Sequence, residues 1–527
     1  MILQALVAVV AGLAHAISMG SPWDGQPNWW LQLLAMGALV WLLERSGSPR
    51  QSAWVGWFFS TAWLCGSFWW LYISMHTYGG LTAILTVLAI FSLAGVLALY
   101  YAFACYYFKA LTLVNKAYSA IVFAALWMTA EMCRGIWFTG FGWGAAGYAH
   151  LESLAVFAKY IGAYGVAALA ACLACQLALV FGGLFRMPFE ARRLWRLLGV
   201  AVIVLAAAWP PHEFSSAGAS MKVALMQGNI SQDEKFQPGT GIADSLKWYG
   251  ARVQATRADL VVAPETAIPV LPEQLPDDYW TALSTPFVGG KQALLIGIPL
   301  GSYTKGYTNS VIGLKPREAS PSGVNAPVAL DVASVYRYDK HHLVPFGEFI
   351  PPLFKWFTQM MNIPLGDFNR GAVGQPSFEW QGQRLAPNVC YEDLFGEELG
   401  ARFADPAKAP TIFVNLSNIG WFGNTVAIDQ HLNISRMRAM EFERPFIRAT
   451  NTGATVIIDH TGHVTHALPR HTRGILLGEV QGRTGTAANA YGVTPYAWWV
   501  ARFGLWPLWI LGFGIPLLAF WRGRRHQ

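Results

Sequence analysis

The chain has 527 residues, of which 54% are hydrophobic and only 13% are charged. Globular chains average about 25% charged residues, so the deficit excludes a wholly soluble protein and also a disordered one. The formal net charge of +7 leaves three explanations open, namely nucleic acid, anionic lipid or the topology of a membrane protein.

The charged residues are unevenly distributed along the chain. Residues 1–210 hold 15 of the 67 Asp, Glu, Lys and Arg residues, residues 211–496 hold 48, and residues 497–527 hold four, all of them Arg. This pattern predicts a membrane block at 1–210, a soluble domain at 211–496, and a further apolar segment with a basic tail at 497–527. The soluble part is long enough to bury a full hydrophobic core.

Eight apolar runs are candidates for transmembrane helices, since a helix needs about 20 apolar residues to cross the hydrocarbon core. The run 153–185 is longer than one span needs, so we expect it to tilt or to extend beyond the bilayer. The first run lacks a positively charged start, which favours a retained span over a cleaved signal peptide. The eight runs lie near residues 2–19, 28–43, 53–73, 80–108, 117–133, 153–185, 195–210 and 498–521.

The basic residues of the short loops predict the orientation of these helices. The loops after the second, fourth and sixth runs and the C-terminal tail hold 11 Lys and Arg residues, whereas the opposite short loops hold only Arg134. Because Lys and Arg collect on the cytoplasmic side, we expect both termini in the cytoplasm. Residues 211–496 then lie in the periplasm of a bacterium, attached to the inner membrane. These loops also account for the net charge, so no nucleic-acid partner is expected.

Two ionisable residues, Glu131 and Arg134, lie near the end of the fifth run. Their spacing of three places them on one helix face, where they can pair with each other. Ionisable groups inside membranes are functional candidates by default. The position near the interface nevertheless favours a structural pair.

The soluble part alternates short apolar runs with amphipathic segments. Buried strands are typically short, apolar and bounded by turn residues, and helical patterns lie near 241–257 and 426–443. The combination predicts a layered α/β domain. The expected strands are Val223–Met226, Leu260–Ala263, Ala293–Ile298, Val335–Tyr338, Ala386–Cys390, Thr411–Asn415 and Thr455–Asp459.

Three of these runs are followed by reactive side chains. Glu265 follows the second run, Lys340 and Glu348 follow the fourth, and Cys390 ends the fifth. Cys390 is the only cysteine of residues 211–496, so it has no disulfide partner there. A thiol nucleophile needs a base for its proton and a cation for the oxyanion. Glu265, Lys340 and Cys390 supply these three roles.

The same blocks resemble the nitrilase (carbon–nitrogen hydrolase) superfamily. Two longer blocks, 340–351 and 415–423, together with the eight flanking helices, resemble bacterial apolipoprotein N-acyltransferases over essentially the whole chain. The resemblance implies a multi-helix membrane domain joined to an αββα sandwich. It also implies a Glu265–Lys340–Cys390 triad and acyl transfer without a metal or other cofactor.

The resemblance extends to further positions of the site. Glu348, Tyr391 and Glu392 match supporting positions of the family, and Glu348 is expected to orient Lys340 or the thiol. Asn415 is expected to form structural hydrogen bonds near the site. Where some members have Trp after a lysine, this chain has Phe236.

Several aromatic residues are candidates for contacts with lipid. The segment 349–361 is richer in aromatic and Met residues than an exposed loop usually is. We therefore hypothesise a mobile lid that touches acyl chains, with a packed connector as the alternative. The candidate contacts with substrate or lipid are Phe236, Trp356, Phe357, Asn415, Trp421 and Phe422.

The expected reaction has two halves. Glu265 takes the proton of Cys390, the thiolate attacks a phospholipid ester, and Lys340 with the Tyr391 N–H binds the oxyanion, at about 3–4 kcal/mol per donor. The resulting thioester then passes its acyl chain to the α-amine of the N-terminal diacylglyceryl-cysteine of an apolipoprotein. The partners are thus a phospholipid donor, an apolipoprotein acceptor and the bilayer, and the enzyme is expected to be a monomer.

Two other classes of protein remain as alternatives. A membrane-anchored amidase or nitrilase would use the same triad to hydrolyse a C–N bond, but it needs a pocket open to water. A transporter with an accessory domain would carry several ionisable residues along its spans. Apart from Glu131 and Arg134, few are present.

Overall fold

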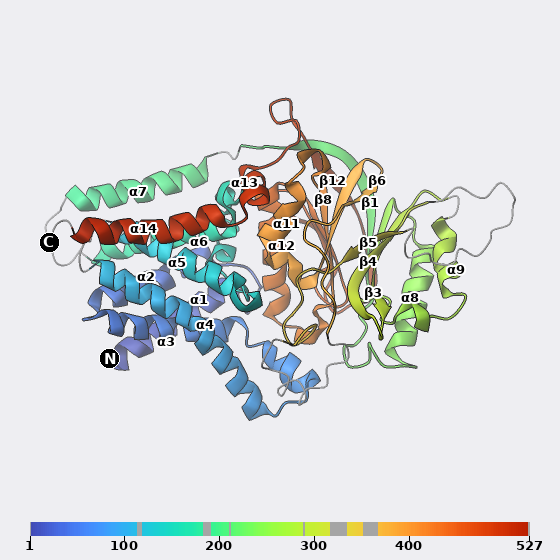
Figure 1. Cartoon of the computed structure of the whole chain (residues 1–527), viewed down its shortest axis with the longest axis horizontal. Helices are drawn as coiled ribbons and strands as arrows, with labels where there is room; N and C mark the ends of the chain where they lie inside the picture. Colours follow the sequence, from blue (N-terminus) through green and yellow to red (C-terminus); the bar gives the residue numbers. More distant parts are fainter. Residues whose placement is uncertain are drawn as a thin grey trace.

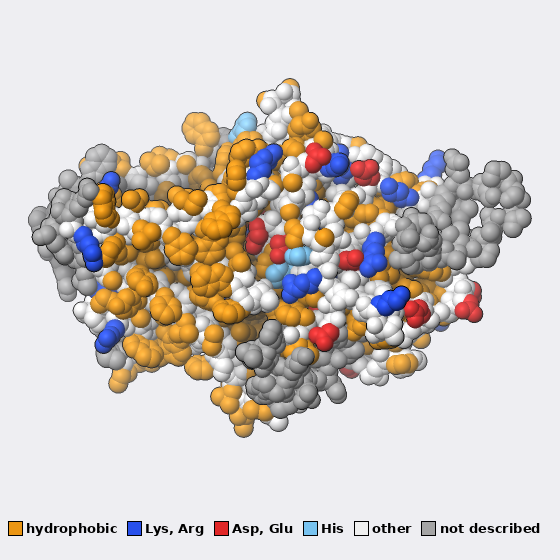
Figure 2. Space-filling view, in the orientation of Figure 1, with side chains coloured by type: hydrophobic (Ala, Val, Ile, Leu, Met, Phe, Trp, Pro, Cys, Tyr) orange, Lys and Arg blue, Asp and Glu red, His pale blue; other side chains and the backbone are white. Residues whose placement is uncertain are grey.

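The computed structural model describes residues 2–112, 118–182, 191–209, 212–287, 290–316, 335–350 and 367–524. Its helical half and its β-rich half lie side by side along the longest axis, and both ends of the chain lie at the far end of the helical half (Figure 1). Hydrophobic side chains cover the visible face of the helical half, whereas charged side chains are spread over the other half (Figure 2). Exposed apolar residues need lipid or protein around them, so this surface fits a bilayer.

The helical half is built from apolar helices joined by short connections. Three stretches are long and apolar enough to cross a membrane, namely Ala83–Thr112, Ser119–Thr139 and Leu154–Phe181. The helices are α1 (Ile2–Ser18), α2 (Trp29–Arg45), α3 (Pro49–Ser67), α4 (Ala83–Thr112), α5 (Ser119–Ile136), α6 (Ala158–Gly182), α7 (Ala191–Ala208), α13 (Pro495–Phe503) and α14 (Trp506–Arg524).

Two of the predicted spans are not single straight helices. In the run 153–185, Gly162 leaves the helical conformation at φ 67°, just after the start of α6. The predicted eighth span is divided into α13 and α14, which meet at an angle of 87°. Gly504 lies at this break with φ 53°, a backbone conformation that residues with a Cβ rarely adopt. Of this pair, α14 alone runs along the helical half (Figure 1).

The direct pair expected between Glu131 and Arg134 is not formed. Glu131 accepts hydrogen bonds from the Trp127 indole at 3.1 Å and the Ala146 N–H at 2.8 Å. Arg134 instead donates to the Tyr101 hydroxyl at 2.8 Å and to main-chain carbonyls of the segment after α5. Among the described residues the two side chains thus bind separate partners, since buried charges need hydrogen bonds and several acceptors are at hand. The structural pair that the sequence favoured is therefore replaced by two separate sets of hydrogen bonds.

The other half contains two six-stranded mixed sheets. The first has the order β12-β1-β2-β3-β4-β5 and the second β11-β10-β9-β8-β7-β6. In each sheet three neighbouring strands are parallel, β1-β2-β3 in the first and β7-β8-β9 in the second. The strands are β1 (Ser216–Gln227), β2 (Leu260–Ala263), β3 (Ala293–Ser302), β4 (Gly306–Leu314), β5 (Tyr336–Asp339), β6 (Phe378–Trp380), β7 (Gln383–Val389), β8 (Ile412–Ser417), β9 (Phe446–Thr450), β10 (Val456–Ile458), β11 (Val464–Ala467) and β12 (Gly474–Thr484).

The two sheets pack face to face and are covered by helices on their outer faces. Side chains of both sheets, such as Leu225 and Val414, share one buried core. Helices α8 (Gly241–Ala255) and α9 (Tyr279–Ser284) cover the first sheet. Helices α11 (Gly396–Gly400) and α12 (Val426–Phe442) cover the second and face the helical half (Figure 1). This arrangement is the expected αββα sandwich.

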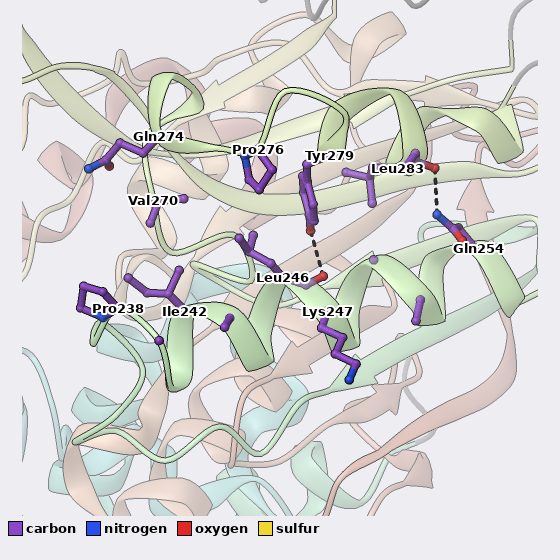
Figure 3. A pocket seen from close by; sticks show the side chains of 15 residues that line it. Pro238, Ile242, Leu246, Lys247, Gln254, Val270, Gln274, Pro276, Tyr279 and Leu283 are labelled. Carbon is purple, nitrogen blue, oxygen red and sulfur yellow. Dashed lines mark hydrogen bonds between the residues drawn. The ribbon is translucent and has the colours of Figure 1, made fainter.

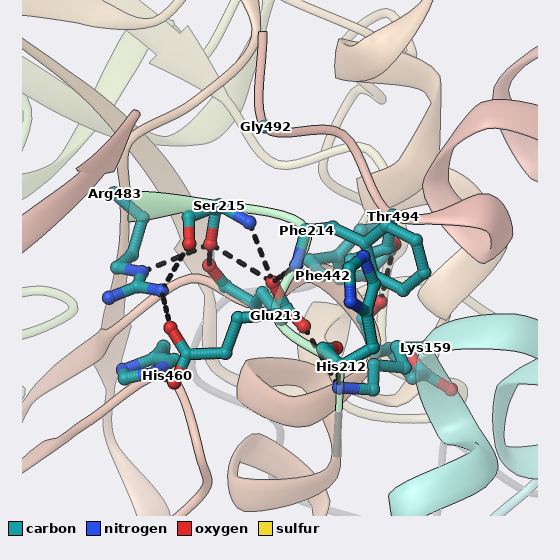
Figure 4. Close-up of polar contacts among 12 residues, drawn as sticks. Lys159, His212, Glu213, Phe214, Ser215, Phe442, His460, Arg483, Gly492 and Thr494 are labelled. Atoms are coloured by element: carbon teal, nitrogen blue, oxygen red, sulfur yellow. Dashed lines mark hydrogen bonds and ion pairs between the residues drawn. The ribbon is translucent and has the colours of Figure 1, made fainter. Parts of the chain in front are cut away.

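Polar contacts join the sandwich to the helical half. The Glu443 carboxylate accepts from Lys159 Nζ of α6 at 3.1 Å and from the Phe214 and Ser215 N–H groups at 2.8 and 3.0 Å (Figure 4). The Gln430 side chain of α12 accepts from the indoles of Trp70 and Trp143. The start of β1 and helix α12 are thereby attached to the helical half.

Candidate active site

The expected catalytic side chains lie just beyond the carboxyl ends of strands. Glu265 follows β2, Lys340 follows β5, and Cys390 follows β7. In α/β sheets the carboxyl ends of parallel strands are the usual place for ligand sites. Cys390 has φ 51°, a left-handed conformation that costs about 1–3 kcal/mol outside Gly and is often found at functional sites. The fold thus presents the thiol on a strained turn.

Lys340 is enclosed by two carboxylates. Its Nζ lies 3.3 Å from Glu265 Oε1 and 2.9 Å from Glu348 Oε1. The Asn309 amide of β4 donates to the same two oxygens, at 2.7 Å each. Lys340 is fully buried, and its own N–H donates to the Asn309 carbonyl at 2.8 Å. One ammonium and one amide therefore hold both carboxylates in place.

These contacts keep both partners of the Glu265–Lys340 pair charged. Burial opposes charge on Glu265, but Lys340, Asn309 and the Asn418 N–H, at 2.7 Å from Oε2, hold its pKa below the usual value. Burial also opposes charge on Lys340, but Glu265 and Glu348 raise the pKa of Lys340 well above the usual value. Glu265 is thus an ionised carboxylate that is able to accept a proton.

The Cys390 thiol is close to these charges but is itself neutral. Burial, with a further contribution from Glu265, raises the pKa of Cys390 to about 12, although Lys340 opposes this shift. The Ser417 hydroxyl donates to Sγ at 3.3 Å. A neutral thiol needs a base as it attacks, so an ionised carboxylate in its neighbourhood matches the chemistry.

Two side chains hold the main chain of the nucleophile. The Cys390 carbonyl accepts from Asn415 Nδ2 at 3.0 Å and lies 3.1 Å from His431 Nε2. Arg448 donates to His431 Nδ1 at 3.1 Å, so the proton of the neutral ring is on Nε2. Nε2 also lies 2.9 Å from Asp393 Oδ1, which orients the ring. This buried network supports the strained turn at Cys390.

The other predicted supporting residues act on the main chain and on the neighbouring half. Glu392 accepts from the N–H groups of His341 and Val389, both at 2.7 Å, and so ties the segment after Lys340 to the segment before Cys390. Burial raises the pKa of Glu392. The Tyr391 hydroxyl donates to the Gly140 carbonyl in the helical half at 3.1 Å.

The predicted lipid contacts are only partly within the described residues. Phe422 packs on Trp70 with ring centroids 4.3 Å apart, and Trp421 meets Tyr78 at 5.8 Å, so both contact the helical half. Phe236 is half-buried beside Lys235. Trp356 and Phe357, with most of the segment 349–361, lie outside the described residues.

Sequence reasoning missed several residues of the site. Asn309 lies on β4, a strand that the apolar pattern does not predict, and Ser417 stands out in the sequence only as part of a longer block. His431 has no partner nearby in the sequence, because Arg448 and Asp393 come from distant elements. A lone polar residue inside a strand or helix gives no spacing signal.

A separate groove of about 700 Å³ lies between α8 and α9 (Figure 3). Hydrogen bonds from Tyr279 Oη to the Leu246 carbonyl and from Gln254 to the Ala282 carbonyl connect the two sides. None of the predicted site residues lines this groove. It lies on the side of the sandwich that faces away from the helical half.

The fold has counterparts among known proteins. Residues 222–489 match the carbon-nitrogen hydrolase family, which defines the sandwich as a nitrilase-like domain. Among solved structures, a mutant of the Nesterenkonia AN1 amidase from the nitrilase superfamily is 17% identical with a TM-score of 0.38, over 56% of this chain and 99% of that chain. A carbon-nitrogen hydrolase from Helicobacter pylori G27 is 16% identical with a TM-score of 0.35, over 55% and 94%.

The helical half has a more specific match. Residues 15–176 match the apolipoprotein N-acyltransferase N-terminal domain. An apolipoprotein N-acyltransferase of Verminephrobacter eiseniae is 55% identical over 94% of this chain and 92% of its own, and one of Ralstonia nicotianae is 42% identical over 99% and 93%. The chain belongs to the apolipoprotein N-acyltransferase family, and it is an acyltransferase.

Proposed function

We propose that this enzyme moves a fatty acyl chain from a membrane phospholipid to the α-amine of the N-terminal diacylglyceryl-cysteine of apolipoproteins, the last step of lipoprotein maturation. One observation carries the proposal: Glu265, Lys340 and Cys390 lie close enough to influence one another's charge. The sandwich that holds them is joined to an apolar helical half. Both lipid substrates are then able to reach the thiol by diffusion in the bilayer.

In the first half-reaction the thiol attacks the donor ester. Glu265 takes the proton from Cys390, and the sulfur bonds to the ester carbonyl carbon. Lys340 and the Tyr391 N–H stabilise the oxyanion, since donors placed for developing charge contribute about 3–4 kcal/mol each. Glu265 then protonates the lysophospholipid alcohol, which leaves an acyl thioester on Cys390.

In the second half-reaction the acceptor amine attacks the thioester. Glu265 removes a proton from the amine as the C–N bond forms. The C–S bond then breaks, and Glu265 returns the proton to the sulfur, which restores the Cys390 thiol. This sequence gives ping-pong kinetics. Glu348 keeps Lys340 in place in both halves through its 2.9 Å contact.

We further propose that residues 1–210 and 497–527 form eight transmembrane helices of the bacterial inner membrane and that residues 211–496 form a periplasmic domain. The position of both chain ends beyond the helical half supports two cytoplasmic termini (Figure 1). Arg522 and Arg524 in the last turn of α14 agree with this orientation. The enzyme acts as a monomer.

The amidase alternative uses the same triad and makes a different product. It would need a small water-soluble amide and a water-filled path to Cys390. The match of residues 15–176 to an acyltransferase domain favours acyl transfer instead. Phe422 and Trp421, shortly after β8, also contact aromatic rings of the helical half rather than polar groups.

Mass spectrometry of the acyl-enzyme tests the proposal. We expect purified enzyme incubated with phospholipid alone to gain the mass of one acyl chain on Cys390. Cys390→Ala should abolish the adduct, whereas Cys65→Ala, at a partly exposed thiol of the helical half, should retain it. An adduct that persists in Cys390→Ala would assign another nucleophile. Hydrolysis of simple amides without any adduct would favour the amidase.

A further inference from the structure

Lys235 is a buried cation that the mechanism above leaves without a task. It lies in the turn that follows β1, and only 1% of its surface is exposed. Its Nζ donates to the main-chain carbonyl of Glu265 at 3.1 Å. Within the described parts of the chain it forms no ion pair, although buried lysines usually have one.

The charges around Lys235 are those of the active site. Burial lowers the pKa of Lys235 to about 7, and Glu265 and Cys390 are the two groups that oppose this shift. In return, the Lys235 ammonium lowers the pKa of Glu265, and it is the second cation to do so beside Lys340. Lys235 therefore interacts electrostatically with the proposed base and the proposed nucleophile, in addition to its hydrogen bond within the fold.

We propose that Lys235 is a positioning residue for the general base: its ammonium fixes the main chain of Glu265 and stabilises the Glu265 carboxylate in the ionised form. The proposal rests on the assignment of Glu265 as the base. Lys340 acts on Oε1 of Glu265 and the Asn418 N–H on Oε2. Lys235 donates to the main-chain carbonyl of Glu265 instead. Its charge therefore stays beside Glu265 while Lys340 stabilises the oxyanion.

The sign of the effect follows from the charges. An ammonium favours ionised Glu265, so a neutral side chain at position 235 raises the pKa of that carboxyl. Less Glu265 is then ionised at low pH, and the acidic limb of the rate profile moves to higher pH. If the pKa of Glu265 rises by about one unit, the fraction of ionised Glu265 at a pH below that pKa falls about tenfold. Lys235 is charged below about pH 7, which is the range where Glu265 titrates.

The experiment compares Lys235→Met, Lys235→Gln and Lys235→Arg in the full-length enzyme in detergent. The readout is single-turnover release of lysophospholipid between about pH 3 and 9, a range that begins below the ordinary glutamate pKa of about 4.3 and so covers the acidic limb. We expect both neutral variants to move the acidic limb upward by about one pH unit, with about a tenfold loss below it and recovery above it. Lys235→Arg keeps the charge and should keep the limb of the unaltered enzyme.

Each result decides the proposal. A loss by the same factor at every pH in both neutral variants would mean that Lys235 serves packing alone. Unchanged profiles would also overturn it. If Lys235→Met fails to fold, as judged by its melting temperature, Lys235→Gln decides, because its amide is able to donate to the Glu265 carbonyl without a charge. If the unaltered enzyme forms no thioester, the proposed function fails instead, so the two failures are distinguishable.

Discussion

Asn309 is the only uncharged side chain that donates to both Glu265 and Glu348 among the described residues. Its amide and the Lys340 ammonium together set the separation of the two carboxylates. Hydrogen bonds to charged groups contribute about 1.5–3 kcal/mol each. The geometry of the base therefore depends on a residue that carries no charge.

Replacing Asn309 tests this dependence. Asn309→Ala removes both 2.7 Å bonds, and we expect kcat for acyl transfer to fall roughly 10–100-fold. Asn309→Asp has nearly the same shape but places a third carboxylate beside the other two, which raises the pKa of Glu265 and should cost more. Steady-state kinetics with both variants measures the order. Equal activity of Asn309→Asp and the unaltered enzyme would contradict the assignment.

The reactivity of Cys390 gives a pH prediction. Because the pKa of this thiol is raised to about 12, its alkylation by iodoacetamide should rise steadily from about pH 7 to pH 10 as the thiolate fraction grows. The negative charge of Glu265 contributes to the shift, so Glu265→Gln lowers the pKa of Cys390. That variant should be alkylated faster at about pH 8 while losing acyl transfer.

Peptide mass spectrometry of the alkylated enzyme measures both rates, with Cys65 as the internal reference. Lys340→Met should act in the opposite direction, since the Lys340 ammonium opposes the raised pKa. Slower alkylation in Glu265→Gln would show that Glu265 deprotonates the resting thiol.

The site residues that could be predicted from the sequence lie in blocks that match the family, and they include neutral ones such as Tyr391 and Asn415. Glu265, Lys340 and Cys390 each follow a short strand, and they occur in family order. Asn309 and His431 lie inside elements, where a polar residue has many ordinary explanations. Their roles depend on contacts with residues far away in the sequence.

At the scale of elements, the strands that could be predicted are short β-rich runs bounded by turn or polar residues. All seven expected strands exist, and β2 has the predicted bounds Leu260–Ala263. The five that were missed, β4, β6, β9, β11 and β12, include edge strands with exposed residues and the three-residue β6. These edge strands are too polar or too short for a periodic signal. β4 and β9 are largely buried, but polar residues such as Asn309 and Arg448 interrupt their apolar runs.

The break between α13 and α14 gives a prediction of its own. Gly504 has φ 53° and ψ −138°, a region essentially confined to Gly, so Gly504→Ala should destabilise the protein by about 1–3 kcal/mol. Gly514 lies inside α14, and a Cβ there also meets nothing within 4 Å. Gly514→Ala is thus a matched control that should keep or raise the melting temperature. A thermal shift assay in detergent compares the two, and equal melting temperatures would contradict the role of the break.

At the scale of the whole molecule, the proposed topology makes a prediction about the two faces of the membrane. A green fluorescent protein fused after Gln527 should fluoresce, because the proposed topology puts the C-terminus in the cytoplasm. Alkaline phosphatase fused there should be inactive, whereas the same enzyme fused after Val493, before α13, should be active in the periplasm. Activity in the reverse order would invert the topology.

The hydrogen bond between Tyr391 and Gly140 has a consequence for how the two halves of the chain evolve. The residue next to the nucleophile is held by a carbonyl of the helical half, and Gly140 reaches that position with φ 72°. A Cβ at Gly140 would lie 1.9 Å from the Gly135 carbonyl oxygen, so other residues do not fit. If recombination between two relatives exchanged only the sandwich, Tyr391 of one protein would meet the Gly140 loop of the other. Substitutions in the segment that holds Tyr391 and in the loop around Gly140 should therefore be inherited together among relatives.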